Sequence, residues 1–145
     1  MSMEPAPAAP PFELDPARDI RNLHGAPGWF ELVTGDPAEA ARFLTGAFGW
    51  EFRTIDVAGS EYFVTLVRGH EVGGLRVPMT GEPDGPRWQT YVTVDDVEAF
   101  ARHAQSTGGE VAVPPMELGE VGKMTAIAHP KAGQLLAFEY ARPFE

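Results

Sequence analysis

Cysteine is absent from the 145 residues of this sequence. Its absence excludes disulfide bonds, thiolate metal sites, iron–sulfur clusters and cysteine nucleophiles. Long apolar runs are also missing, since none approaches the roughly 18 residues that a membrane helix needs. The N-terminus has no basic segment followed by an apolar one, so we expect no secretory signal and a cytoplasmic location.

Positive charge is scarce, because 11 Lys and Arg stand against 21 Asp and Glu, for a formal net charge of −10. Such a balance opposes binding to nucleic-acid phosphates and to anionic membranes. We therefore expect neither nucleic acid nor membrane as a partner.

The length predicts one domain that can bury a core without crosslinks. Residues 1–26 are expected to form an N-terminal tail, whose Ala- and Pro-rich first part should be flexible. Residues 27–142 are expected to form the single domain.

Two similar halves make up this domain. In each half, periodicity predicts a strand, a helix opened by an acidic cap, and three more strands. A Gly- and Pro-rich connector at 80–86 separates them. The predicted strands are 29–34, 50–55, 62–67 and about 72–77 in the first half, and 88–93, 110–113, 123–128 and 135–140 in the second.

The halves match at a constant offset of 59 positions, which relates Trp29 to Trp88 and the helix-capping Asp36 to Asp95. Helix capping by itself explains why acidic residues recur at this offset, but it does not explain why tryptophans do. We infer an internal duplication, with module 1 at about 27–79 and module 2 at about 86–142. One module leaves a sheet face uncovered, so pairing two modules completes the core.

Several short phrases, in this order, resemble the vicinal oxygen chelate superfamily, which includes glyoxalase I, extradiol dioxygenases and bleomycin-resistance proteins. These phrases are 31–36, Phe48-Gly49-Trp50, 91–97, 108–111 and His129-Pro130 with Gly133. The resemblance implies an α+β fold, in which two tandem βαβββ modules form a cupped, incompletely closed eight-stranded mixed sheet with helices outside. It also implies a symmetric homodimer.

Metal-dependent members of that superfamily hold a divalent ion with four side chains, from the first and last strands of each module. Counting from the capping acids and the turn glycine assigns three of these positions to Trp29, Trp88 and Ala137, and the indole ring has no free lone pair. The fourth strand, 72–77, contains no carboxylate or imidazole. A one-residue slip would bring Gln89 into one position without restoring the set. We therefore expect no metal site and no cofactor.

Glu31 is the candidate catalytic residue. Strand alternation directs Trp29 and Glu31 toward the cavity and Phe30 and Leu32 toward the helix, while Val92 and Val94 would lie under the second helix, opposite Trp88. A carboxylate between apolar neighbours at a cavity has its charged form disfavoured, which suits a general base. The alternative is a solvated or salt-bridged glutamate, paired with Arg76.

A further set of side chains offers apolar area, hydroxyl groups or a guanidinium to a planar ligand, although core packing explains most of them equally well. These ligand-binding candidates are Trp29, Tyr62, Arg76, Trp88, Tyr91, Met124 and Phe138. The first hypothesis is a metal-independent protein that binds a small, partly aromatic ligand. The alternatives are a lyase or isomerase that uses Glu31 as base, and a metal-dependent glyoxalase or dioxygenase.

Overall fold

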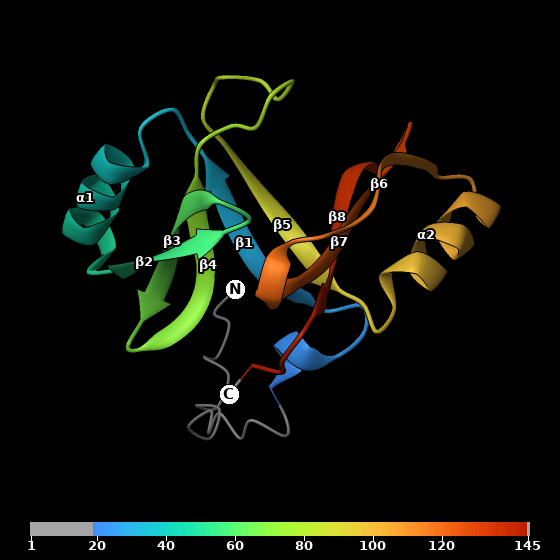
Figure 1. Ribbon diagram of the computed structural model, residues 1–145, viewed down its shortest axis with the longest axis horizontal. Coiled ribbons are helices and arrows are strands. Elements are labelled where there is room, and N and C mark those ends of the chain that lie inside the picture. The colour runs from blue at the N-terminus through green and yellow to red at the C-terminus, as the bar shows by residue number, and fades with distance from the viewer. Residues whose placement is uncertain (1–18, 145) are drawn as a thin grey trace, which may run out of the picture.

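The computed structural model describes residues 19–144. Within this range the chain forms eight strands, two α-helices and two short 3-10 helices (Figure 1). The elements are η2 (Ile20–Asn22), β1 (Pro27–Val33), α1 (Pro37–Phe48), β2 (Glu51–Val57), β3 (Ser60–Val67), β4 (His70–Arg76), β5 (Arg87–Thr93), α2 (Val97–Ser106), β6 (Glu110–Glu117), η3 (Gly119–Val121), β7 (Gly122–His129) and β8 (Gly133–Tyr140).

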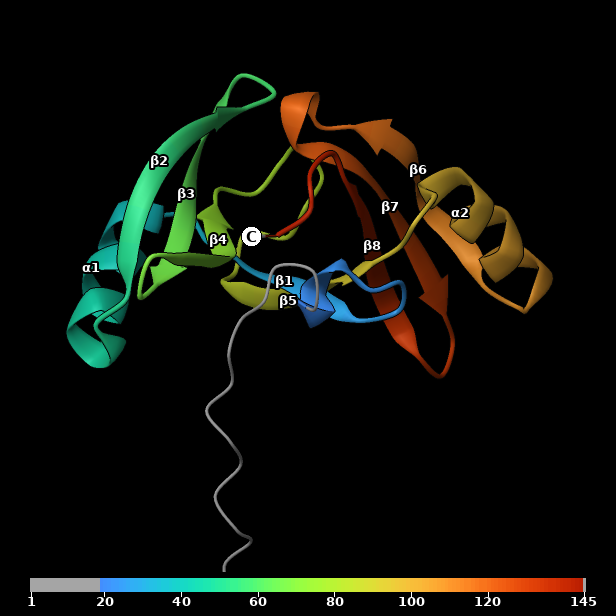
Figure 2. The same ribbon diagram turned by 90° about the horizontal axis from the view of Figure 1, so that it is seen from below.

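All eight strands belong to one mixed sheet, in the order β2-β3-β4-β1-β5-β8-β7-β6. The central pair, β1 and β5, is antiparallel, whereas β4 pairs with β1 and β8 pairs with β5 in parallel. The outer strands of each half rise as the two walls of an open cup, and the helices lie outside it (Figure 2). The predicted fold class is confirmed.

Aspartate caps begin both helices. Asp36 accepts a hydrogen bond from the Glu39 N–H at 3.1 Å, and Asp96 accepts one from the Ala99 N–H at 3.0 Å. The two caps lie 60 positions apart, so the offset of 59 and the helix start at Asp95 are both wrong by one residue. A carboxylate stands at both 95 and 96, and the sequence pattern alone does not tell which one bonds the helix N–H.

This slip of one residue reverses the faces of β5, because successive side chains on a strand point to opposite sides. The pairing of Glu31 with Gln89 and of Trp29 with Tyr91 directs Gln89 and Tyr91 into the cup. Trp88 instead lies on the outer face against Phe30, with ring centroids 5.7 Å apart. Positions 88, 92 and 94 share one face of the strand, so the prediction that Trp88 lies opposite Val92 and Val94 is wrong, whereas Val94 packs under α2 as expected.

Each helix buries an apolar cluster against the outside of the sheet. Under α1, Leu32 and Leu75 pack against Ala41 and Leu44, as expected for Leu32. Under α2, the cluster contains Val94, Val97 and Ala137.

A third cluster lies on the inner face, around Tyr91, Met124 and Phe138. Apolar side chains are thus buried on both faces of the sheet, and those of the inner face form the wall of the cup.

In the part of the chain that the structure describes, no helix is long and apolar enough to cross a membrane. The flexible tail predicted for the first residues falls outside the described residues. Of the rest of the predicted tail, residues 19–26, Ile20–Asn22 form η2, and the backbone carbonyl of Arg21 accepts a hydrogen bond from the Thr93 hydroxyl at 2.6 Å.

Candidate functional site

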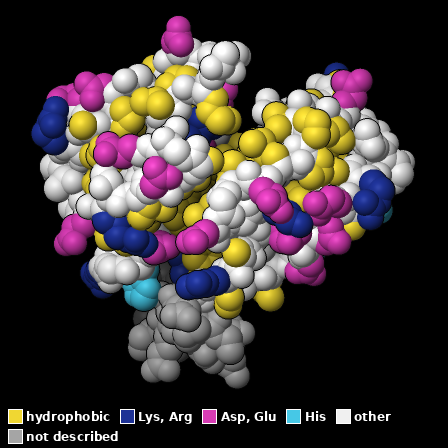
Figure 3. Space-filling model, in the orientation of Figure 1, with side chains coloured by type: hydrophobic (Ala, Val, Ile, Leu, Met, Phe, Trp, Pro, Cys, Tyr) yellow, Lys and Arg dark blue, Asp and Glu magenta, His cyan; other side chains and the backbone are white. Residues whose placement is uncertain are grey.

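The inner face of the sheet encloses a cavity of about 580 Å³. Side chains of β1 to β5 and β8 line it, together with η2, η3 and residues 142–144. Figure 3 shows hydrophobic side chains gathered between the two halves of the molecule. The size suits a small organic molecule.

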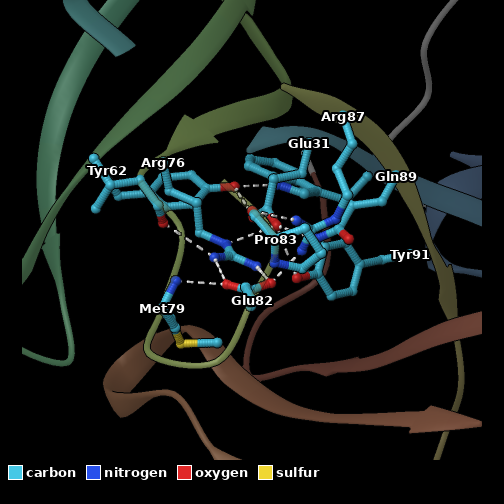
Figure 4. Close-up of polar contacts among 11 residues, drawn as sticks. Glu31, Tyr62, Arg76, Met79, Glu82, Pro83, Arg87, Gln89 and Tyr91 are labelled. Carbon is cyan, nitrogen blue, oxygen red and sulfur yellow. Dashed lines mark hydrogen bonds and ion pairs between the residues drawn. The ribbon is translucent and has the colours of Figure 1, made fainter. Parts of the chain in front are cut away.

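At the floor of the cavity, the carboxylate of Glu31 is only 3% exposed and accepts four hydrogen bonds (Figure 4). Tyr62 donates its hydroxyl to Oε2 at 2.7 Å. Oε1 accepts hydrogen bonds from Arg76 Nε at 2.9 Å, Gln89 Nε2 at 2.7 Å and the Tyr91 hydroxyl at 3.0 Å. The buried charge is thereby paired and hydrogen-bonded, as such charges must be.

The two tyrosines of this network are strong donors but poor acids. Burial, and then the charge of Glu31, raises the pKa of Tyr62 well above its ordinary value. The same two causes, in the same order, raise the pKa of Tyr91. Both hydroxyls therefore stay protonated and hold the carboxylate in place.

Below the floor, Glu82 from the connector between β4 and β5 holds two arginines. Its carboxylate contacts Arg76 at 2.6 and 3.0 Å, forms an ion pair with Arg87, and accepts the Met79 N–H at 2.7 Å. Burial acts to raise the pKa of Glu82, but these hydrogen bonds lower it to about 2. Two carboxylates and two guanidiniums thus form a network with no net formal charge.

Aromatic rings form a shelf at one side of the cavity, which we call the aromatic shelf and which consists of Trp29, Tyr140 and Phe144. The Trp29 and Phe144 rings are stacked at 6.1 Å between centroids, and Tyr140 meets Phe144 edge-on at 4.7 Å. The indole N–H of Trp29 donates to the Tyr62 hydroxyl at 2.8 Å, which links the shelf to the Glu31 network.

The structure brings five of the predicted site residues to the cavity wall: Trp29, Glu31, Tyr62, Tyr91 and Phe138. Three others lie elsewhere. Met124 is buried in the inner-face cluster without lining the cavity, and Arg76 lies below the floor with its guanidinium bound to two carboxylates. Trp88 is 51% exposed on the outer face.

The residues of the site that were not predicted include Gln89, Tyr140 and Phe144. If Asp96 rather than Asp95 had been taken as the cap of the second helix, Gln89 would have been predicted to face the cup. Tyr140 lies on the inner face of β8 with Phe138, and strand alternation from Phe138 could have found it. No pattern in the sequence places Phe144 against Trp29.

The cavity residues do not fit the divalent metal that the resemblance implies. The corrected register puts Trp29 and Glu31 of β1 and Gln89 and Tyr91 of β5 on the inner face, and Ala137 lies under α2 instead.

On β4, Gly74 occupies an inward position, and a Cβ there would meet the Tyr62 ring at 2.1 Å. Glu31 and Gln89 remain as possible oxygen donors, but Glu31 already accepts four hydrogen bonds, one of them from a guanidinium.

Outside the cavity, Asp96, Glu98 and Glu139 bring three carboxylates within 4.8 Å of one another at the start of α2. Glu139 already accepts the Val97 N–H at 2.9 Å, and Glu98 lies 3.6 Å from Lys123. Asp96 and Glu139 thus accept hydrogen bonds from the N–H groups that begin α2, and the cluster is separate from the site described above.

Comparison with known proteins gives curated relatives that are longer than this chain. "Putative glyoxylase CFP32" of Mycobacterium tuberculosis is 34% identical over 110 residues, which cover 73% of this chain and 42% of that protein. "Anthracycline biosynthesis protein DnrV" of Streptomyces peucetius is 31% identical over 121 residues, which cover 73% and 44%. The chain thus spans less than half the length of these relatives.

Solved structures share the fold at low sequence identity. Methylmalonyl-CoA epimerase from Mycobacterium tuberculosis superposes with a TM-score of 0.59 at 16% identity, covering 84% of this chain and 95% of that one. A hypothetical protein, BH1468 from Bacillus halodurans, gives a TM-score of 0.62 at 12% identity, covering 81% and 95%.

A family model matches most of the domain, from residue 26 to residue 138. Its matched range contains both helices and nearly all of the sheet. The chain belongs to the Glyoxalase/Bleomycin resistance protein/Dioxygenase superfamily.

Proposed function

We propose that this protein binds a small, flat aromatic molecule in its cup and does so without a metal ion. One observation carries the proposal: the cavity combines an aromatic shelf with a floor carboxylate that already accepts four hydrogen bonds. Flat rings stack well on Trp and Tyr side chains, which bury large area with specific geometry. The occupied carboxylate leaves shape and stacking as the main sources of affinity.

The relatives support the aromatic class of ligand. DnrV is named for anthracycline biosynthesis, and anthracyclines carry a flat fused-ring core. The match covers less than half of that protein, so its name bears on this chain only through the shared domain. A flat polycyclic compound is therefore the natural first probe.

The second candidate function is a lyase or isomerase with Glu31 as general base. Its position at the cavity floor favours this role. The four hydrogen-bond donors to Glu31 argue against this role, because a general base needs a free lone pair directed at the substrate proton. Glu31→Gln separates the two functions, because a base is essential for turnover whereas the amide keeps the shape that a binding floor requires.

Titration with an anthracycline, followed by calorimetry, tests the proposal. Trp29→Ala removes the main stacking surface inside the cup, and we expect it to weaken binding by about tenfold, within the range for truncated aromatic anchors. Trp88→Ala removes a tryptophan from the outer face and serves as the matched control, with unchanged affinity expected. Equal losses in both variants, or no binding by the wild type, would contradict the proposal.

Metal independence needs its own measurement. Elemental analysis of protein purified without chelators should find no stoichiometric zinc, nickel, iron or manganese, and probe affinity should be the same after chelation. A stoichiometric ion would revive the metal-dependent glyoxalase or dioxygenase. The homodimer and the cytoplasmic location stay predictions, and native mass spectrometry of the same sample tests the first.

A further inference from the structure

The C-terminal residues 141–144, which we call the strap, cross the mouth of the cup after β8 ends. The strap begins at Ala141, whose N–H donates to the Val121 carbonyl at 3.1 Å. Three of its residues, Arg142, Pro143 and Phe144, then line the cavity. In Figure 2 this end of the chain lies between the two walls of the cup.

Phe144 is held inside the cup by contacts on every part of the residue. Its backbone N–H donates to Asn22 Oδ1 at 2.6 Å, and its carbonyl accepts from Asn22 Nδ2 at 3.0 Å. The guanidinium of Arg21 lies 4.3 Å from the ring centroid, a cation–π distance. The ring also contacts Trp29 and Tyr140 of the aromatic shelf.

We propose that the strap is an internal occupant of the ligand site, with the Phe144 ring standing where an aromatic ring of the ligand binds. This inference rests on the proposed function. A ligand ring then replaces Phe144 against Trp29 and under Arg21, and the strap moves out of the cup. Binding is thereby limited by the fraction of molecules in which the strap has left.

The weak attachment of the strap indicates that it can leave the cup and is not a fixed part of the cavity wall. Phe144 is only partly buried, and the strap is outside the β-sheet ladder that holds Tyr140. Beyond the Ala141 hydrogen bond at its start, its attachments are two hydrogen bonds to the Asn22 side chain and the contacts of the Phe144 ring, each of modest strength. Trp29, by contrast, lies within β1 at the centre of the sheet.

Anthracycline titration of Phe144→Ala and Asn22→Ala tests the inference. Phe144→Ala removes the occupying ring and should tighten probe binding by about tenfold, the ratio expected if the strap leaves the site in about one molecule in ten. Asn22→Ala removes the backbone clamp but keeps the ring, and should tighten binding by a smaller factor. Phe48→Ala, an exposed phenylalanine on α1 outside the cup, is the matched control and should change nothing.

Amide hydrogen exchange at Phe144 gives an independent readout, because its N–H is bonded to Asn22 in the free protein. The probe should speed exchange at this amide if the strap is displaced. Slower exchange, or weaker binding by Phe144→Ala, would overturn the inference and leave the proposed function standing. Absence of binding by the wild type and by both variants would overturn the proposed function and this inference with it.

Discussion

The salt bridge between Glu31 and Arg76 provides a sharp test of the site's energetics. Arg76→Met removes one donor and leaves the Glu31 carboxylate, 3% exposed, with three neutral donors. Breaking a buried pair in this way costs about 3–5 kcal/mol of unfolding free energy, because the remaining charge is uncompensated. Glu31→Gln keeps the shape but loses the charge, and should cost about 1–3 kcal/mol through weakened charge-assisted hydrogen bonds.

The double variant Glu31→Gln/Arg76→Met should cost less than the sum of the single variants, since it leaves no unpaired charge at the floor. We expect a coupling free energy of about 1–3 kcal/mol, measured by urea unfolding with circular dichroism. Arg42→Met breaks an exposed ion pair with Glu39 on α1 and should not shift the midpoint measurably. Additive single effects would refute the reasoning, because they would mean that Glu31 and Arg76 do not stabilise one another.

Three further predictions concern the same floor. The pKa of Glu82 falls from its ordinary 4.5 to about 2, so its stabilising effect is complete above 4.5 and is lost as pH falls toward 2; acid titration of stability should show a shallower loss in Glu82→Gln. Burial comes first among the causes that raise the pKa of all three tyrosines, so absorbance at 295 nm should show no ionisation step near pH 10 in the native protein, and a step there would contradict their burial. Gly74→Ala places a Cβ 2.1 Å from the Tyr62 ring and should cost about 1–3 kcal/mol in urea unfolding, whereas Gly35→Ala, with open space around it, should be tolerated.

The sequence was sufficient to predict the elements and their order. Helix caps, alternating strands and the repeated order of elements are local signals, and each reports on a few neighbouring residues. They predicted all eight strands and both helices of the described chain, and the alternation of β1 correctly directed Trp29 and Glu31 into the cup. Local signals therefore sufficed wherever the structure depends on short stretches of chain.

The register of β5, and hence which of its side chains face the cup, was not predictable in the same way. Asp95 and Asp96 are both good caps, and choosing the wrong one moved Trp88 to the wrong face and hid Gln89. A shift of one residue leaves helix and strand propensities unchanged but exchanges the inner and outer faces of a strand. The contact of Phe144 with Trp29 is harder still, because it joins segments 115 positions apart through a turn and not through a repeating pattern.

At the floor of the cavity, Gly74 and Tyr62 are packed so closely that neither can change without affecting the other. The glycine at 74 on β4 leaves room above the backbone, and the Tyr62 ring from β3 fills that room closely enough to exclude even a Cβ. From there the Tyr62 hydroxyl reaches Glu31 and accepts the indole N–H of Trp29. A metal-ligating side chain placed at 74 would therefore displace Tyr62 and remove a donor from Glu31, so such a side chain and the present hydrogen-bond network exclude one another.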